Sequence, residues 1–353
     1  MSKILSIEEI VKRAKAGRAS DIHIVRGIPI RMRVDGRLVD IDDNVMTHED
    51  CEAYAKELSP RAHEIDGIGE MDLAVSVDDI RCRVNIFRQQ GSVSAAIRLL
   101  NDRMPTFEEL GLPSQIQRFT EFKQGIVLVT GETGAGKSTT LASILNHINH
   151  NQSKHIITLE DPIEYVYTAD KCVINQREVG QDTRSFADGL KSILREDPDI
   201  ILVGEMRTLN TIETALIAAE TGHLVFATLH TNSAADTIDR IVKVFPAEQE
   251  TQVRMQLSTC LQAVMCQQLL PHSSGRGRVL ATEIMFANGA IRNLIREGKT
   301  PQISNAIVTS AAEGNQLMDT SLINLYRARK ITSETALHSA HDRDFVKRTL
   351  MLQ

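Results

Sequence analysis

Two different patterns of apolar and polar residues divide the chain. Up to residue 100, short apolar runs carry polar residues at alternate positions, which is typical of strands with one exposed face. After Gly125, continuous apolar runs alternate with stretches whose apolar residues recur at helical spacing, as in a mainly parallel sheet covered by helices. We therefore expect an α/β protein, in which a small α+β unit with an antiparallel sheet precedes a larger α/β unit.

The first unit is predicted to open with a helix, because Ser6 and Glu9 form a capping-box pattern. Two strand-like runs follow, and the second contains a hairpin turn at Asp35-Gly36. After a charged helix, three more strands complete the unit. In order, the predicted elements are strands DIHIVRG and PIRMRVDGRLVDI, helix HEDCEAYAKEL, and strands MDLAVSV, IRCRVNIFRQ and SVSAAIRLL.

The second unit is expected to contain four core strands, GIVLVTG, HIITLED, DIILVGE and HLVFATLH. Beyond His230 the chain is predicted to be mostly helical to its end, apart from the strand-like run RVLATEIMF. Proline and glycine interrupt the stretch that joins the two units. The expected domains are residues 1–100, a linker with a first packing helix at 101–124, a second domain at 125–290, and a helical C-terminal region at 291–353.

The motif GETGAGKS, Gly131 to Ser138, indicates nucleotide binding. It matches G-x-x-x-x-G-K-[ST] and lies between an apolar strand and a helix, which is the context of a phosphate-binding P-loop. Lys137 is predicted to reach the β- and γ-phosphates, and the Ser138 hydroxyl to ligate Mg²⁺, whereas Glu132 should point to solvent. The residues predicted to bind nucleotide are Gly131, Thr133, Gly134, Ala135, Gly136, Lys137, Ser138 and Thr139.

A nucleoside triphosphatase also needs carboxylates that hold Mg²⁺ and orient water. The run DIILVGE fits a Walker B strand, with Glu205 at the C-terminal end, where ligands bind in such sheets. A second strand end, TLEDPIEY, supplies Glu160, Asp161 and Glu164. Taken alone, the first segment is also compatible with a helix-capping acid and the second with a solvated charge cluster. Beside a P-loop, both are candidates for positioning metal and water.

The run GHLVFATLHT is predicted to be a buried strand with a histidine at each end. His223 and His230 are seven residues apart, so a regular strand would place them on opposite faces, which argues against a paired metal site. His230 lies at the C-terminal end, and we expect it to sense the γ-phosphate or to contact Glu164 and Glu205. His223 is expected to support packing or a subunit contact.

Composition bears on the partners of the protein and on the compartment in which it is found. The net charge is −6, tryptophan is absent and aromatic residues make up 4% of the chain, so neither a basic nucleic-acid footprint nor a base-stacking platform is indicated. The five cysteines form no CxxC pair, and we expect them to be packing residues in a reducing compartment. Charged residues interrupt the N-terminal apolar pattern and no apolar run is long enough for a bilayer, so we expect a cytoplasmic protein without a signal peptide or transmembrane segment.

Four boxes in the chain resemble the hexameric ATPases of type IV pili and type II secretion. They are Walker A (GETGAGKS), an aspartate box (ITLEDPIEYVY), Walker B (ILREDPDIILVGEMR) and a histidine box (TGHLVFATLHTNSAADTIDRIVKVFP). The likeness extends from SDIHI to the C-terminal region. Within this superfamily the chain is most similar to the pilus retraction ATPases (PilT-type twitching motors), because it lacks a tetracysteine zinc segment and contains AIRNLIRE. By spacing alone, that motif is an amphipathic helix with Ile291, Leu294 and Ile295 inward and Arg292 and Arg296 outward.

The resemblance implies a PAS-like α+β domain followed by a RecA-like P-loop ATPase domain with a helical C-terminal region. It implies a homohexameric ring that binds ATP and ADP, hydrolyses ATP with Mg²⁺, and powers pilus retraction, pilin disassembly and twitching motility. The implied partner is a pilus platform protein of the inner membrane, which would hold the cytoplasmic ring at the inner face of that membrane. Glu132 and Ala135 stand where relatives often have Pro and Ser, and neither difference removes a phosphate contact.

The resemblance also assigns roles to individual residues. Glu164 and Glu205 are the implied catalytic carboxylates, and they would complete the Mg²⁺ shell with Ser138, partly through water. Lys137 and His230 complete the implied catalytic set on the ATPase domain. Arginines of the N-terminal domain are implied to approach the phosphates, where a planar guanidinium suits charge spread over several oxygens, and the candidates are Arg83 and Arg98.

Three other functions stay open on the sequence alone. The first is a motor with another cargo: a pilus-assembly or type II secretion ATPase, or an accessory retraction ATPase. The second is a nucleotide-gated scaffold that binds ATP without hydrolysing it, which the intact Lys137, Glu164 and Glu205 argue against. The third is a DNA-translocating motor, which the acidic net charge and the pilus-type boxes disfavour.

Overall fold

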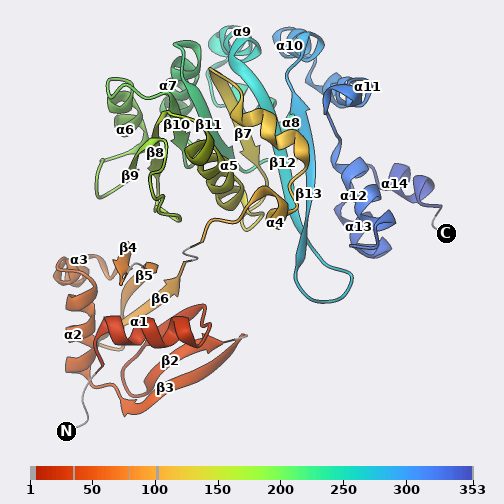
Figure 1. Ribbon diagram of the computed structural model, residues 1–353. Helices are drawn as coiled ribbons and strands as arrows, with labels where there is room; N and C mark the ends of the chain where they lie inside the picture. Colours follow the sequence, from red (N-terminus) through yellow and green to blue (C-terminus); the bar gives the residue numbers. More distant parts are fainter. Residues whose placement is uncertain (1–4, 35, 79, 101–102, 352–353) are drawn as a thin grey trace. The chain divides into compact units, whose positions relative to one another are not determined.

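The structure is a computed structural model that describes residues 5–34, 36–78, 80–100 and 103–351. Asp35 of the predicted hairpin turn and the first two residues of the predicted linker lie outside these ranges. By their contacts, the residues form two compact units, each with its own sheet (Figure 1). The first unit is Met1–Arg103 with Pro162–Val166, and the second is Met104–Asp161 with Tyr167–Gln353.

The first unit is an antiparallel sheet with helices packed on it. Its elements are α1 (Ile7–Ala16), β1 (Asp21–Ile24), β2 (Pro29–Val34), β3 (Arg37–Val45), α2 (His48–Leu58), η1 (Ala62–Glu64), α3 (Ile65–Ile68), β4 (Glu70–Val77), β5 (Ile80–Gln89) and β6 (Ser92–Leu99). The strand order is β3-β2-β1-β6-β5-β4, and every neighbouring pair is antiparallel. The predicted capping box of α1 is confirmed: the Ser6 hydroxyl accepts the N–H of Glu9, whose carboxylate accepts the N–H of Ser6.

The sheet of the first unit has one apolar and one polar face. Ile22 and Ile97, which face each other in the register of β1 and β6, are buried in a core that α1 and α2 complete. The residues of opposite parity, Asp21 and Arg98, also face each other and lie outside that core. Alternation with period two along each strand therefore places the polar side chains of several strands on one face.

The second unit has a seven-stranded sheet in the order β13-β12-β7-β11-β10-β8-β9, parallel except for the pair β12 and β13. Its strands are β7 (Gly125–Thr130), β8 (His155–Glu160), β9 (Val173–Glu178), β10 (Ile200–Val203), β11 (Leu224–Leu229), β12 (Leu261–Pro271) and β13 (Arg278–Phe286). Its helices before β12 are α4 (Phe107–Leu110), η2 (Ser114–Thr120), α5 (Lys137–Asn151), α6 (Phe186–Ile193), α7 (Leu209–Glu220), α8 (Ala234–Val242), η3 (Ala247–Gln249) and α9 (Glu250–Cys260). After β13 come α10 (Gly289–Arg296), η4 (Thr300–Gln302), α11 (Ile303–Thr309), η5 (Ala311–Glu313), α12 (Met318–Arg327), α13 (Ser333–Ser339) and α14 (Arg343–Thr349).

Both faces of the central strands are buried, because helices cover both sides of this sheet (Figure 1). Val127 and Phe226 pack in a core with side chains of α5 and η2. Ile126 and Val225, one position away, belong to the other core, which includes α7, α8 and α9. Burial on both faces explains the uninterrupted apolar runs in the sequence. In the described part of the chain, no helix has the length and apolar character needed to cross a membrane.

The expectation of a mostly helical chain beyond His230 is wrong for β12. This buried strand lies between β7, to which it is parallel, and β13, to which it is antiparallel. An apolar run such as LQAVMC suits a buried helix as well as a buried strand, and only its pairing partners, distant in sequence, decide between them. The edge strand β9, where polar and apolar residues mix, was not predicted either.

The segment before α12 covers the free edge of β13. Gln316 and Ile284 exchange backbone hydrogen bonds, both 2.8 Å long, and the Asn315 side chain accepts the backbone N–H of Phe286. These bonds satisfy backbone groups that an edge strand otherwise leaves unpaired. The C-terminal helices are thereby attached to the sheet that carries the P-loop.

Candidate active site

The P-loop follows β7 and passes close to the neighbouring strand β12. A Cβ atom on Gly131 would lie 2.4 Å from the carbonyl oxygen of Gln267, and Gly131 has a φ of +141°, so glycine is required there. Gln267 is 1% exposed, and its Nε2 donates to the carbonyl oxygen of Ala135 at 2.6 Å. The main chain and side chain of one buried residue thus support the loop. No pattern in the sequence pointed to Gln267, because its partner Ala135 lies 132 positions away.

Lys137, the first residue of α5, is only 9% exposed. Its Nζ donates to the carbonyl oxygens of Gly131 at 2.8 Å and Glu132 at 3.0 Å, and lies 3.4 Å from Nδ1 of His230. The ammonium group therefore lies between the P-loop and the C-terminal end of β11. Thr133 and Ser138 are exposed, as is Glu132, in agreement with the expectation that Glu132 points to solvent.

Backbone bonds to two other strands fix the position of Glu205, which follows β10. The N–H of Gly204 donates to the carbonyl oxygen of Leu159 at 2.8 Å, and the N–H of Met206 donates to that of Thr228 at 3.1 Å. Glu205 thus lies between β8 and β11 at the C-terminal edge of the sheet. This is the edge at which open parallel sheets bind ligands.

The structure brings Glu205, His230 and Lys137 together. Oε1 of Glu205 lies 3.0 Å from Nε2 of His230 and 2.5 Å from Nε of Arg207. The bond to Glu205 raises the pKa of Arg207, and the nearby Asp161 adds to this shift. A cavity of about 260 Å³ opens at this point, lined by Glu205, Met206, Arg207, Leu229, His230 and Arg240. Arg207 was not singled out from sequence, although it lies two residues after Glu205.

His223 is at the opposite end of β11 and belongs to a different environment. Its Nδ1 lies 3.0 Å from the carbonyl oxygen of Ala218, near the end of α7, and its own carbonyl oxygen accepts the N–H of Gly125. These bonds join the end of α7 to the starts of β7 and β11. The two histidines therefore have different environments: His230 contacts Glu205, whereas His223 bonds to the backbone near the end of α7.

Glu164 lies in the segment Pro162–Val166, which groups with the first unit by its contacts. Its predicted role with Glu205 stays a prediction. Arg83 and Arg98 are directly opposite each other in the register of β5 and β6, and both are exposed. Their predicted approach to phosphates also stays a prediction.

Asp21 binds one of these two arginines. Nε of Arg98 donates to its Oδ1 at 2.8 Å, and Nε of Arg33 lies 3.9 Å from its Oδ2. Burial alone would raise the pKa of Asp21, but the bonds from Ser20 and Arg98 outweigh it, so the pKa is lowered. The polar face of the first sheet therefore carries arginines around one carboxylate.

Arg292 of the AIRNLIRE motif does not point outward, so that expectation is wrong. Its Nη1 donates to the carbonyl oxygens of Ser258 and Thr259, each at 2.8 Å, and its Nη2 donates to the Gln262 side chain at 3.1 Å. The guanidinium thus caps the last turn of α9, where unpaired carbonyls favour a cation. Burial lowers the pKa of this half-buried group. Helical spacing alone did not predict this contact, because the strands β12 and β13 separate α9 from α10 along the chain.

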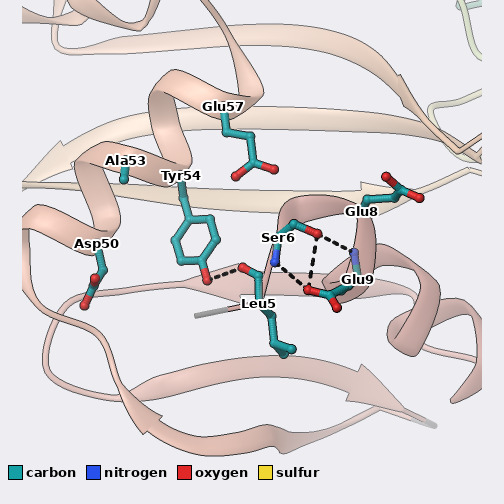
Figure 2. A pocket seen from close by; sticks show the side chains of 8 residues that line it. All are labelled: Leu5, Ser6, Glu8, Glu9, Asp50, Ala53, Tyr54 and Glu57. Atoms are coloured by element: carbon teal, nitrogen blue, oxygen red, sulfur yellow. Dashed lines mark hydrogen bonds between the residues drawn. The ribbon is translucent and has the colours of Figure 1, made fainter. Parts of the chain in front are cut away.

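A larger cavity, of about 540 Å³, lies in the first unit and is unsuited to a nucleotide (Figure 2). Four carboxylates line it, and each has a structural partner. The carboxylates of Glu9 and Asp50 complete capping boxes, that of Glu57 accepts the N–H of Ile7, and that of Glu8 binds Lys12. Their negative charge would repel phosphates, so the second unit holds the better nucleotide site.

Known proteins resemble this chain over most of its length. The family model for type II/IV secretion system protein matches residues 2–282. The type IV pilus retraction ATPase PilT of Pseudomonas aeruginosa is 45% identical over 339 residues, which cover 95% of this chain and 98% of that protein. A twitching motility protein of Neisseria gonorrhoeae is 51% identical over 274 residues, covering 77% and 73% of the two chains. A crystal structure of the pilus retraction motor PilT with bound ADP has a TM-score of 0.92 and 47% identity, and covers 98% of this chain and 100% of that one.

Proposed function

Because this chain belongs to the type II/IV secretion system protein family, we propose that it is an ATPase motor that powers pilus retraction. The observation that carries the proposal is that residues following three different strands lie close together at one edge of the sheet. Lys137 follows β7, Glu205 follows β10 and His230 follows β11. The His230 side chain lies within hydrogen-bonding reach of both Lys137 and Glu205. Pilus retraction is supported by the name of a 45% identical relative, a type IV pilus retraction ATPase. A second relative, 51% identical, is named a twitching motility protein.

ATP binds on the P-loop in this proposal. Backbone N–H groups at the start of α5 and the Lys137 ammonium neutralise its phosphates, because a helix N-terminus and a cation both favour anions. Mg²⁺, when bound with the nucleotide, withdraws charge from the phosphate oxygens. The exposed hydroxyl of Ser138 and the partly exposed carboxylate of Glu205 are oxygen donors of the type that Mg²⁺ prefers, so the site fits this ion.

Glu205 orients the attacking water and accepts its proton. His230 holds that carboxylate through Nε2, while its Nδ1 faces Lys137, so the imidazole touches both the acidic and the basic member of the site. Glu164, Arg83 and Arg98 belong to the first unit, and we propose that they complete the site in a homohexameric ring. A guanidinium is suited to charge that spreads over phosphate oxygens during transfer.

The ring is proposed to be cytoplasmic and to dock on a pilus platform protein of the inner membrane. The resemblance to retraction ATPases supports this partner, and the polar, arginine-bearing face of the first sheet supports contacts to a second copy. A homohexamer by size-exclusion chromatography with light scattering is the expected state. Direct nucleic-acid binding is not part of this function.

Purified protein tests the enzymatic part. We expect Mg²⁺-dependent ATP hydrolysis in the hexameric fraction. Lys137→Ala should abolish nucleotide binding, whereas Glu205→Gln should bind nucleotide and lose about 10²- to 10³-fold in kcat, the scale of a lost transition-state contact. Lys154→Ala is the matched control, because Lys154 pairs with Asp199 on the surface at 3.2 Å. A folded hexamer that binds ATP but never hydrolyses it, even with its platform, would instead be a nucleotide-gated scaffold.

Deletion in the native host tests the cargo. Loss of a retraction motor should leave cells with pili that cannot twitch. Cells without pili would indicate an assembly motor. If the gene restores twitching only in cells that also contain a second retraction ATPase, the protein has an accessory role. Salt-sensitive DNA binding by the purified protein would revive the translocase alternative.

A further inference from the structure

A buried carboxylate outside the proposed catalytic set bonds to two helices. Glu283, in β13, is 3% exposed. Its Oε1 accepts the N–H of Ala234 at 2.7 Å, and its Oε2 accepts the N–H of Met318 at 3.3 Å. Ala234 is the first residue of α8, and Met318 is the first residue of α12. One side chain therefore joins a helix next to the ATPase site to a helix of the C-terminal region.

The two helix starts depend on this carboxylate in different ways. The N-cap of α12 is Leu317, and it forms no side-chain cap bond, so Glu283 supplies an acceptor that the helix itself lacks. The N-cap of α8 is Ser233, whose hydroxyl accepts a different donor, the N–H of Asp236. Burial raises the pKa of Glu283, and the bonds from Ala234 and Met318 oppose this shift. A buried carboxylate is costly unless it is bonded, so both contacts matter for keeping Glu283 in place.

The start of α8 is also the end of the segment that carries His230. We call residues 230–233 the histidine loop. His230 contacts Glu205 and Lys137, and the Asn232 side chain donates to Glu132 of the P-loop at 3.4 Å. The loop therefore touches the candidate active site at one end and ends at Ala234 at the other. A shift of the first turn of α8 would move the loop, because only four positions separate His230 from Ala234.

We propose that Glu283 is a positioning residue for the ATPase site, which holds the histidine loop against Glu205 and couples that loop to α12. Movement of the C-terminal helices would reach His230 through the two bonds of this carboxylate, and movement of His230 would reach α12 by the same route. The effect on turnover rests on the proposed ATPase function. The structural coupling between the loop and α12 does not.

Glu283→Gln and Asp319→Asn form a matched pair for the test. Asp319, in α12, is 5% exposed and also accepts two backbone N–H groups, those of His341 and Asp342, each at 2.8 Å. Both substitutions replace a buried carboxylate by an amide of nearly equal size, which removes acceptor capacity next to a backbone donor. Asp319 follows Met318 in α12, and its charge adds to the raised pKa of Glu283. Both bonds of Glu283, to α8 and to α12, remain in Asp319→Asn, so only Glu283→Gln should affect the histidine loop.

Hydrogen exchange of the full-length protein gives the first measurement. Glu283→Gln should speed amide exchange about fivefold or more in residues 230–237 and at the start of α12, because a lost bond lowers the free energy of local opening. Asp319→Asn should speed exchange around residues 341–346 and leave 230–237 unchanged. Unchanged exchange at 230–237 in Glu283→Gln overturns the proposal, whether or not the protein hydrolyses ATP.

Steady-state kinetics of the assembled protein gives the second measurement. Glu283→Gln should lower kcat about fivefold with little change in the Kd of a fluorescent ADP analogue, since a displaced catalytic group slows turnover more than binding. Asp319→Asn should leave kcat within about twofold, because both bonds of Glu283 that hold the histidine loop and α12 remain in that variant. In a His230→Ala background, Glu283→Gln should cause no further loss. If the two losses multiply instead, or if both amide variants lower kcat equally, Glu283 has only a structural role.

Discussion

The two sheets of this protein place their polar side chains in different ways. In the six-stranded sheet, alternation puts Asp21, Arg98 and Arg83 side by side across one exposed face. In the seven-stranded sheet, Glu205 and His230 come after strand ends, because the inner strands have no free face. A sheet covered on one side can spread polar groups over its surface, whereas a sheet covered on both sides concentrates them at one edge.

This difference has an energetic consequence. Side chains on the open face interact through water-exposed pairs, which contribute little to stability. The residues at the edge of the covered sheet depend on close backbone contacts, which tolerate little change in shape. Substitutions at the edge should therefore have larger effects than substitutions on the face, and the following changes test this ordering.

Gly131→Ala should have the largest effect. The added Cβ would meet the carbonyl oxygen of Gln267 at 2.4 Å, at a φ of +141°. We expect the free energy of unfolding to fall by about 3 kcal/mol or more, and nucleotide binding to be lost. Gly134→Ala is the control, because its φ is +82° but no atom lies within 4 Å, so only about 1 kcal/mol should be lost. Equal losses in urea denaturation of the two variants would show that close packing on β12 is unimportant.

The two ends of β11 should differ in turnover. His230→Ala should lower kcat about 10- to 100-fold, because the imidazole contacts both Glu205 and Lys137. His223→Ala should leave kcat of the folded protein within about twofold and lower stability by about 1 kcal/mol, the scale of one hydrogen bond. Steady-state ATPase assays and thermal unfolding separate the two effects. Equal losses of kcat in the two variants would contradict the division of roles.

Arg292→Ala should lower the free energy of unfolding by about 1–3 kcal/mol, because three hydrogen bonds to the end of α9 and to Gln262 are lost. Arg296→Ala is the control on the same helix, since Arg296 is exposed. Circular dichroism during chemical denaturation measures both. If the two variants are equally stable, the cap on α9 contributes nothing.

Substitutions on the open face should change stability least. Arg98→Ala breaks the pair with Asp21, in which Arg98 is 66% exposed, so we expect a loss below about 1 kcal/mol. Arg83→Ala should change stability even less. If the two arginines act on phosphates in the ring, as proposed, both variants should still lose kcat. Normal turnover in both would remove them from the site and leave the open face without a catalytic role.

Local patterns predicted much of the fold. Alternation and turn residues identified the strands of the first unit, and the capping box at Ser6 fixed the start of α1. The strand, P-loop and helix around Lys137 predicted a nucleotide site, because those residues are contiguous. The positions of Glu205 and His230 near the P-loop could also be predicted, since each follows a parallel strand and such strands end at one edge of the sheet.

The class of each half of the protein and the presence of a P-loop could be predicted from the sequence, because both depend on residues that are neighbours in the chain. The folded structure was needed to show that residues 261–271 form a strand, that Gln267 supports the P-loop, that Arg292 caps α9, and that Glu283 joins α8 to α12. The contacts of Gln267, Glu283 and Arg292 join residues that are 30 to 132 positions apart. Hydrophobic periodicity records which face of an element is buried but not which partner covers it, so these contacts could be identified only once the elements were packed together.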